Sequence, residues 1–260
     1  MREIFRKVDG LIMGYKIWYY TPSYKRVWGV EVNKLIPGVK ICVHEFEADG
    51  YVAEYGKESV LIMSDKLKGN MAKVRNWMVE YSKKNGDDVC VLMDDDVKSV
   101  GYYEDMVKNE VNYEDIYRKI KDMWKMCMDL DIGLFGINLQ SDPKFYREYT
   151  PYSFHSPVLW PFTCIVMGKL GDIRYDERLG LNEDYDLFIQ MCHRDWKVLR
   201  CNKWHYTCGH IKDKWWCGAY RTLDREKKQA EIMKEKWWDV VKYDFARSTN
   251  PVVKIPYRGI

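Results

Sequence analysis

Short apolar runs separated by turn residues mark the first hundred positions of the chain. Four of these runs have the length of strands: residues 15–21 (YKIWYYT), 39–44 (VKICVH), 59–63 (SVLIM) and 89–93 (VCVLM). Their apolar residues are continuous rather than alternating, which is typical of strands that are covered on both faces. The runs therefore predict a mostly parallel sheet with helices on both sides.

Apolar residues at helical spacing predict the helices that accompany these strands. One helical face is formed ahead of the fourth strand by Met71, Val74, Met78 and Tyr81. Asn112 can cap a second helix, whose apolar stripe runs from Ile116 to Leu130. Strands that alternate with helices in this way indicate a doubly wound, nucleotide-binding half.

The second half of the chain departs from this regular alternation of short apolar runs and helical patterns. We expect a strand at residues 132–138, a helix at 183–194, a late strand at 197–206 and a charged helix at 222–245. Between the first two lies a long segment, residues 140–161, and a loop of that length in a compact domain is usually functional. Its aromatic residues are candidates for contacts with an acceptor molecule: Phe145, Tyr146, Tyr149, Tyr152 and Phe154.

These elements predict an α/β fold of the Rossmann type: a mixed, mostly parallel sheet flanked by helices. We expect one domain at residues 1–221 and a C-terminal helix and tail, residues 222–260, packed on the same domain. No apolar run is long enough to span a membrane, and the first residues lack the apolar core of a signal peptide. The eight cysteines form no CxxC pair, which favours a reduced, cytoplasmic protein.

Charge limits the classes of partner. The 42 basic and 39 acidic residues give a net charge of +3. A protein that binds nucleic acid mainly through electrostatics usually has a larger basic excess. A DNA partner is therefore permitted by the charge but not indicated by it.

Three consecutive carboxylates give the strongest chemical signal. Asp94, Asp95 and Asp96 directly follow the apolar run VCVLM. Ligands of open α/β sheets bind at the carboxyl ends of the strands. Residues i and i+2 of an extended chain point the same way, so Asp94 and Asp96 can share a hard cation such as Mn²⁺ or Mg²⁺. An ordinary acidic turn is the alternative reading.

A second acidic group precedes the helix at 183–194. Glu183, Asp184 and Asp186 suit the positive end of a helix dipole, and this alone can explain them. One of the three carboxylates can also face a cleft and act as a general base toward an acceptor hydroxyl.

Histidines and one arginine complete the set of candidates. His205 and His210 are candidate ligands that would complete an oxygen-rich Mn²⁺ site, although each can equally be an ordinary histidine in an aromatic region. Arg75 lies near the start of the first helix, where a basic side chain suits a phosphate group.

The order of these features resembles the GT-A class of nucleotide-sugar glycosyltransferases. Val74-Arg75-Asn76 is similar to the Ala-Arg-Asn pattern of family 2 members, the acidic triplet stands where their DxD motif stands, and Glu183-Asp184 stands where their Glu-Asp motif stands. More closely, residues 15–220 resemble the TET-associated glycosyltransferases of bacteriophages. The segments that carry this likeness are PSYKR, HEFEADGYVAEYG, LMDDDV, LFGIN and LNEDYDLF.

The resemblance implies a role for each candidate residue. Asp94 would touch the donor or the metal, Asp96 would be the principal metal ligand, and Asp95 would lie in the nucleotide-sugar site. Ser23 and Glu45 would lie beside the nucleobase, with Arg75 near the nucleotide. Asp184 would be the catalytic carboxylate, and His205 or His210 a late metal ligand.

The resemblance also implies the reaction. A sugar would pass from a nucleotide-diphosphate sugar, most simply a UDP-sugar, to a hydroxymethylated pyrimidine of phage DNA such as 5-hydroxymethylcytosine. A phage-encoded enzyme of this kind would work in the host cytoplasm. The sequence leaves the oligomeric state open, and it leaves open whether the anomeric configuration is retained or inverted.

Other readings stay open at this stage. The acceptor can be a small molecule or a glycan. A sugar nucleotidyltransferase shares the general fold but normally opens with a Gly-rich phosphate loop, which PSYKR lacks. The acidic triplet also suits a two-metal nuclease. A module that binds nucleotide or DNA without chemistry would have little need for acids at both motifs.

Overall fold

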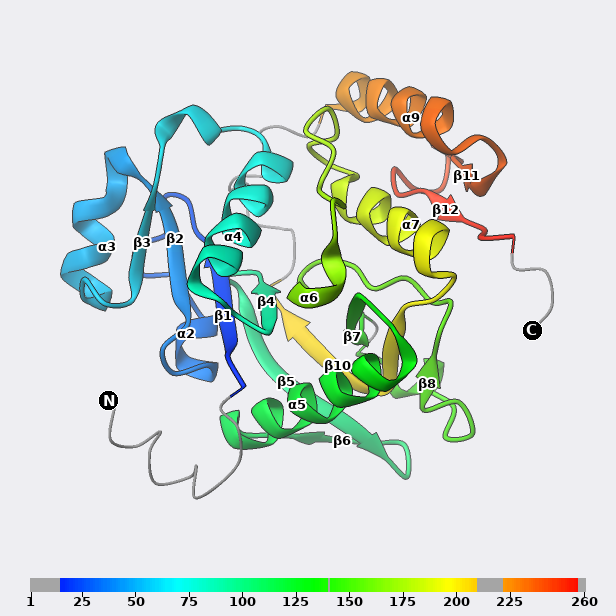
Figure 1. The fold of residues 1–260 in the computed structure, drawn as a ribbon, viewed down its shortest axis with the longest axis horizontal. Helices are drawn as coiled ribbons and strands as arrows, with labels where there is room; N and C mark the ends of the chain where they lie inside the picture. The colour runs from blue at the N-terminus through cyan, green and yellow to red at the C-terminus, as the bar shows by residue number, and fades with distance from the viewer. Residues whose placement is uncertain (1–14, 140, 210–221, 257–260) are drawn as a thin grey trace.

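The computed structural model describes residues 15–139, 141–209 and 222–256 (Figure 1). One ten-stranded sheet runs through the molecule in the order β3-β2-β1-β4-β9-β7-β10-β5-β6, with β8 paired to β10. The strands are β1 Ile17–Pro22, β2 Lys40–His44, β3 Val60–Met63, β4 Val89–Met93, β5 Val97–Glu104, β6 Val107–Glu110, β7 Leu134–Asn138, β8 Tyr152–Ser153, β9 Phe162–Val166 and β10 Leu199–Cys208.

The direction of the strands decides which loops meet. The strands β3, β2, β1 and β4 are parallel neighbours, and β10 is parallel to β7. The strand β9 lies between β4 and β7 and is antiparallel to both, with Met93 opposite Phe162 and Gly136 opposite Thr163. The start of β9 therefore lies at the same edge of the sheet as the ends of β4 and β7.

Helices cover both faces of the sheet (Figure 1). The helices α2 (Val32–Leu35), α3 (Ala48–Tyr55) and α5 (Tyr113–Leu130) pack on one face. The helices α4 (Met71–Asn85), α6 (Met167–Leu170), α7 (Glu183–Asp195) and α9 (Leu223–Trp237) pack on the other. Neighbouring residues of one strand enter opposite layers: Val91 belongs to the first core and Leu92 to the second. The continuous apolar runs thus form two-sided strands, and the predicted fold class is confirmed.

Several elements follow the sequence pattern closely. The Asn112 side chain caps α5 by accepting a hydrogen bond from the Asp115 amide at 3.0 Å, and α7 begins at Glu183 as expected. The pattern did not predict α3, the β5–β6 hairpin or β9. The hairpin was missed because β6 reads VKNE and carries no apolar face.

The C-terminal helix is shorter than the expected range 222–245. It ends at Trp237 because Trp238 adopts a left-handed φ of 45°, and the chain then forms η4 (Trp238–Val240), β11 (Val241–Lys242) and β12 (Val252–Val253). Met233 and Val241 join the core cluster beneath α4 and α7. None of the helices in the described ranges has the length and apolarity needed to cross a membrane.

Candidate active site

Three segments from distant parts of the sequence meet at the carboxyl edge of β4. They are the acidic triplet after β4, the residues before β9, and the first turn of α7. The Asp94 amide donates a hydrogen bond to the Pro161 carbonyl at 3.1 Å, which joins the triplet to the segment before β9. Arg75 of α4 forms an ion pair with Glu183 of α7 at 2.9 Å. The structure thus brings together both acidic motifs and the arginine.

The three carboxylates of the triplet do not share one environment. Asp95 is buried and points away from its neighbours: it accepts hydrogen bonds from the Ser23 hydroxyl at 2.7 Å and from Arg26 at 2.9 Å. Asp94 and Asp96 are only partly buried. The carboxylate of Asp95 therefore has a structural role, whereas those of Asp94 and Asp96, which are two residues apart, are open to a ligand.

The pKa values of Asp94 and Asp96 are both raised above those of ordinary carboxyl groups. Burial, together with the charges of Asp96 and Asp95, raises the pKa of Asp94 to about 8, although Arg75 and a hydrogen bond from the Trp160 side chain act to lower it. Burial also raises the pKa of Asp96, against the opposing charge of Arg26. A cation bound between two carboxylates stabilises the ionised form of both. Two carboxylates whose pKa values are raised are therefore stabilised more by a bound cation than two ordinary ones.

The pair fits a divalent cation on two further observations. The Oδ1 atom of Asp96 is buried without a hydrogen-bond partner among the described residues. At Gly209, a Cβ would stand only 3.1 Å from the Asp96 Oδ2 atom, so a side chain at this position would crowd the carboxylate. Within the described ranges no three His, Cys, Asp or Glu side chains converge as a metal cluster. A site with two carboxylates suits Mg²⁺ or Mn²⁺, which take further oxygen ligands from substrate phosphates.

The acidic residues of α7 also have separate environments. Glu183 is buried against Arg75, and both side chains are at most 5% exposed. The Asp184 side chain accepts a hydrogen bond from the Tyr185 amide at 2.8 Å. Burial raises the pKa of Asp184, while the charge of Arg75 and backbone hydrogen bonds act to lower it. A carboxylate with a raised pKa is suited to accept a proton near neutral pH.

Asp186, in the same turn, is directed elsewhere. It is fully buried and accepts hydrogen bonds from Trp237 Nε1 at 2.7 Å and Lys236 Nζ at 2.9 Å, both from the end of α9. Gln190 donates a third at 2.7 Å. The sequence placed Asp186 among the catalytic carboxylates, whereas the structure engages it in anchoring the C-terminal helix.

Trp160 is the residue that the sequence did not identify. Its side chain hydrogen-bonds Asp94 and its backbone hydrogen-bonds Asp184, so it links the two motifs. The guanidinium of Arg75 lies 3.9 Å from the centre of its indole ring. The only sequence signal was its place at the end of the aromatic segment 140–161. Behind the site lies Tyr206, whose pKa is raised by burial and by the charges of nearby residues that include both Asp94 and Asp184.

The residues expected beside a nucleobase lie at the ends of β1 and β2. Ser23 is buried and donates a hydrogen bond to Asp95, so it helps to fix the position of the acidic triplet. Glu45 is exposed at the start of the short η1 helix (Glu45–Glu47). Next to them is an open groove lined by Lys25, Arg26, Val27, Trp28, Gly29, Phe46 and Glu47.

His205 does not join this cluster. His205 pairs with Gly101 in the β10–β5 ladder, whereas Gly209, four residues further along the chain, is the residue whose amide contacts the Asp96 carbonyl. The His205 ring lies against Tyr103, with the ring centres 4.5 Å apart. His210 lies outside the described residues.

The aromatic segment divides into packing residues and exposed residues. Tyr146 is buried and stacks on Tyr103 at 5.2 Å, and the Tyr152 hydroxyl accepts a hydrogen bond from Lys119 at 2.7 Å. The other three candidates present exposed rings: Phe145, Tyr149 and Phe154. These three are the exposed rings of the segment that a partner can contact.

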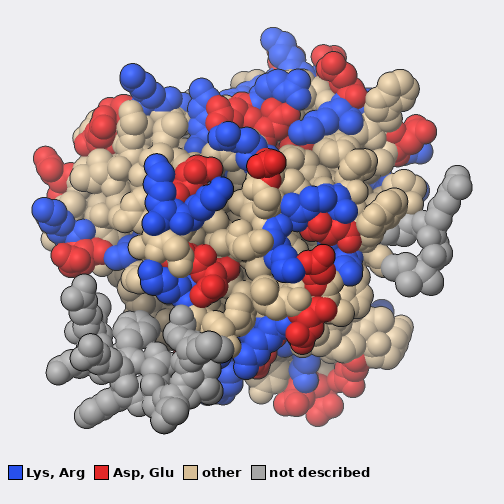
Figure 2. Space-filling model, viewed as in Figure 1, with Lys and Arg blue, Asp and Glu red and all other residues tan. Residues whose placement is uncertain are grey.

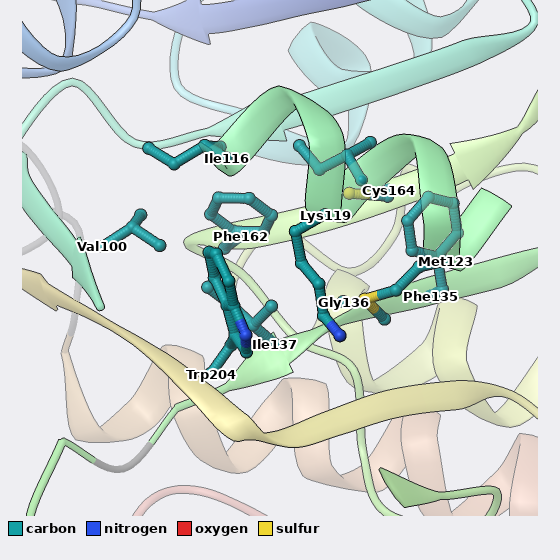
Figure 3. Close-up of a pocket in the computed structure, with 11 residues that line it drawn as sticks. Val100, Ile116, Lys119, Met123, Phe135, Gly136, Ile137, Phe162, Cys164 and Trp204 are labelled. Atoms are coloured by element: carbon teal, nitrogen blue, oxygen red, sulfur yellow. The ribbon is translucent and has the colours of Figure 1, made fainter. Parts of the chain in front are cut away.

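A second cavity belongs to the core rather than to the site. It lies between α5 and the sheet and is lined mainly by apolar side chains such as Val100, Ile116 and Phe162 (Figure 3). Lys119 extends along it beside Trp204, and its amine reaches the Tyr152 hydroxyl. The lining residues belong to the core on the α5 face of the sheet, whereas Arg75 extends from α4 on the other face.

Comparisons with known proteins place this chain in a family. A crystal structure described as "Crystal Structure of a Mycobacterial Protein" superposes with a TM-score of 0.52 at 11% identity, covering 85% of this chain and 74% of that one. This likeness shows the fold alone. A197 from STIV (TM-score 0.41, 12% identity, 75% of this chain and 86% of that one) is more distant.

A CMP:2-keto-3-deoxy-manno-octonic acid synthetase complexed with CTP is similarly distant, with a TM-score of 0.40 at 10% identity over 85% of this chain and 99% of that one. No curated protein matches the sequence. The family model of the TET-associated glycosyltransferases matches residues 36–214, which include both acidic motifs, Arg75 and Trp160. The chain therefore belongs to the TET-associated glycosyltransferase family and is a nucleotide-sugar glycosyltransferase.

Proposed function

We propose that this enzyme is a metal-dependent glycosyltransferase that moves a sugar from a UDP-sugar to the hydroxyl of a hydroxymethylated pyrimidine, such as 5-hydroxymethylcytosine, in DNA. The observation that carries the proposal is the pairing of two kinds of carboxylate at one edge of the sheet. Asp94 and Asp96 have no direct cationic partner in the described structure, and Asp184 lies across Trp160 from them.

Asp94 and Asp96 would hold Mn²⁺ or Mg²⁺. When bound, the cation neutralises the diphosphate and so favours its departure. Neither histidine is needed for this, because the substrate oxygens complete the coordination. The groove beside Arg26 and Phe46 suits the nucleoside, because it combines an exposed ring with basic side chains.

The chain's own residues would manage the proton and the charge. In an inverting reaction, Asp184 takes the proton of the acceptor hydroxyl as its oxygen bonds to the anomeric carbon. The bond from that carbon to the phosphate oxygen breaks, and UDP leaves. Arg75, held between Glu183 and the Trp160 ring, keeps a fixed positive charge beside these groups. If the reaction retains configuration, Asp184 has another part, and the anomeric configuration of the product distinguishes the two courses.

The acceptor side is supported by the exposed rings of the aromatic segment. A base inside a duplex must be taken out of the stack before its substituent can react, and flat side chains suit a flipped base. Phe145 and Tyr149 are 68% and 82% exposed. The view of Figure 2 shows basic and acidic side chains interspersed rather than one basic patch, so a small-molecule or glycan acceptor is the second candidate.

The donor is tested by thermal unfolding against UDP, GDP, CDP, ADP and TDP, each with and without Mn²⁺. A ligand that binds only the folded state raises the melting temperature by mass action. We expect a shift with UDP that requires the metal and that is lost in Asp96→Asn. A shift with another diphosphate would replace the donor, and a shift independent of metal would remove the cation from the proposal.

The acceptor is tested by transfer from the radiolabelled donor to three molecules. They are DNA that contains 5-hydroxymethylcytosine, the same DNA unmodified, and the free hydroxymethylated nucleoside. We expect label in the first only, and a reduced rate in Tyr149→Ala with unchanged donor binding. Label in none of them, together with turnover on a glycan or small-molecule panel, would establish the second candidate.

A further inference from the structure

The C-terminal segment, residues 222–256, lies outside the part of the chain that the family model matches, residues 36–214. It nevertheless contacts the turns that lead into both helices of the site. The Arg225 guanidinium donates a hydrogen bond to the Gly69 carbonyl at 3.2 Å, just before α4. The Gln229 side chain accepts one from the Leu181 amide at 2.8 Å, just before α7. Since α4 supplies Arg75 and α7 supplies Asp184, α9 braces the starts of both helices.

The end of α9 makes the tightest of these contacts. Lys236 Nζ lies 2.8 Å from Asp186 Oδ1, and Trp237 Nε1 donates to the same oxygen at 2.7 Å. Lys236 also reaches Asp176, in the segment before α7, at 3.1 Å. Asp186 is fully buried, so the C-terminal segment supplies the cation in contact with a carboxylate inside the protein. Removing one partner of such a pair leaves an uncompensated buried charge, which is strongly destabilising and which a movement of the Asp186 carboxylate would relieve.

That movement would fall on the catalytic turn. Asp186 and Asp184 are two residues apart in the first turn of α7, so a shift of one backbone carries the other with it. Tyr243, which directly follows β11, lies close enough to Asp184 and Tyr185 for their charges to act on it. The C-terminal segment therefore contacts this turn through the end of α9 and lies near it again at Tyr243.

We propose that the C-terminal segment is a positioning element for the Asp184 carboxylate and acts through the contacts of Lys236 and Trp237 with Asp186. The inference rests on the proposed function, since it assigns a purpose to the geometry of Asp184 in sugar transfer. It also gives Asp186 a role in the reaction that is exerted through position rather than through contact with the substrate.

Two variants test the contact with little loss of packing. Lys236→Met removes the cation and keeps the aliphatic stem, and Trp237→Phe removes the N–H donor and keeps a ring. We expect kcat to fall by about 10- to 100-fold in each, because a small displacement of a catalytic group has an effect of this size. The KM for the donor and the metal-dependent thermal shift with UDP should stay at the wild-type values. Lys228→Met, an exposed lysine of the same helix, is the matched control and should keep full kcat.

A double-mutant cycle separates positioning from general stability. If Lys236 acts through Asp186, Lys236→Met combined with Asp186→Asn should lower kcat by no more than the larger single effect. Fully additive losses, or wild-type kcat in both Lys236→Met and Trp237→Phe, would overturn the inference and leave the proposed function intact. A wild-type enzyme that neither transfers nor hydrolyses any nucleotide-sugar would overturn both.

Discussion

The acidic triplet after β4 and the first turn of α7 each contain three acidic residues, but the two regions compensate the charges of different ones. In the triplet, the middle residue is compensated: Asp95 is held by Arg26 and Ser23, and its two neighbours stay open. In α7 the outer residues are compensated, Glu183 by Arg75 and Asp186 by Lys236, and Asp184 between them stays open. In both regions, therefore, compensated carboxylates hold the fold, and the open ones face the shared edge.

The sharpest test of this division is the loss of an open carboxylate. Asp96→Asn and Asp184→Asn should each lower sugar transfer by at least about 100-fold, since in the proposed reaction one would remove a metal ligand and the other a proton acceptor. Neither should lower the melting temperature of the metal-free protein, because each removes a charge that burial disfavours. Transfer assays and thermal unfolding of the same preparations measure both effects. Full activity in either variant would refute the role given to that residue.

Loss of a compensating cation should lower the stability of the fold, which the loss of an open carboxylate should not do. Arg26→Met leaves the buried Asp95 charge without its ion-pair partner. We expect a loss of about 1 to 3 kcal/mol in the free energy of unfolding, less than for a fully buried pair because Arg26 is partly exposed to water. Urea unfolding measures the loss, with the exposed Lys57→Met as a control. Equal stability of the two variants would show that Asp95 is not held by this pair.

The raised pKa of Asp94 predicts a smaller effect, on pH dependence. Its pKa is about 8 in the folded protein and 3.8 in an ordinary environment. Between these values the folded state binds a proton that the unfolded state does not, so stability falls as pH rises toward 8. In metal chelator, the free energy of unfolding should decrease from about pH 6.5 to about pH 8. Asp94→Asn should abolish the decrease, and saturating Mn²⁺ should reverse it.

His205 lies outside both motifs, and its environment predicts a second effect on pH dependence. Burial, together with the charge of Lys108, lowers its pKa to about 4, against the opposing charge of Glu110. Neither ring nitrogen has a hydrogen-bond partner in the part of the chain that the structure describes. Between pH 6.5 and 4 the unfolded state binds a proton that the folded state excludes, so stability falls as pH drops through this range. His205→Phe should flatten that slope, whereas the exposed His193→Asn should leave it unchanged.

The sequence was informative wherever a local pattern decides the structure. Two-sided apolar strands, the Asn112 cap and the opposite orientations of Asp94 and Asp95 all follow from spacing alone. The purpose of Asp186 could not be read in this way, because its partners Lys236 and Trp237 lie 50 and 51 residues further along the chain. Trp160 and His205 were beyond local patterns for the same reason. Their environments depend on β9 running against its neighbours and on the register of β10 with β5.

The reversed direction of β9 has a consequence for how acceptor preference can diversify in this fold. The segment between β7 and β9 leaves the sheet at Asn138 and re-enters at Phe162, and the paired strands hold both ends at the catalytic edge. Residues 141–150 of this segment lie ahead of β8, so their length and composition can change without altering the pairing of β8 with β10. Trp160, which hydrogen-bonds Asp94 and Asp184, lies near the end of the segment and would have to be kept. We therefore expect that grafting this part of the segment between relatives changes the acceptor preference and leaves the donor preference unchanged.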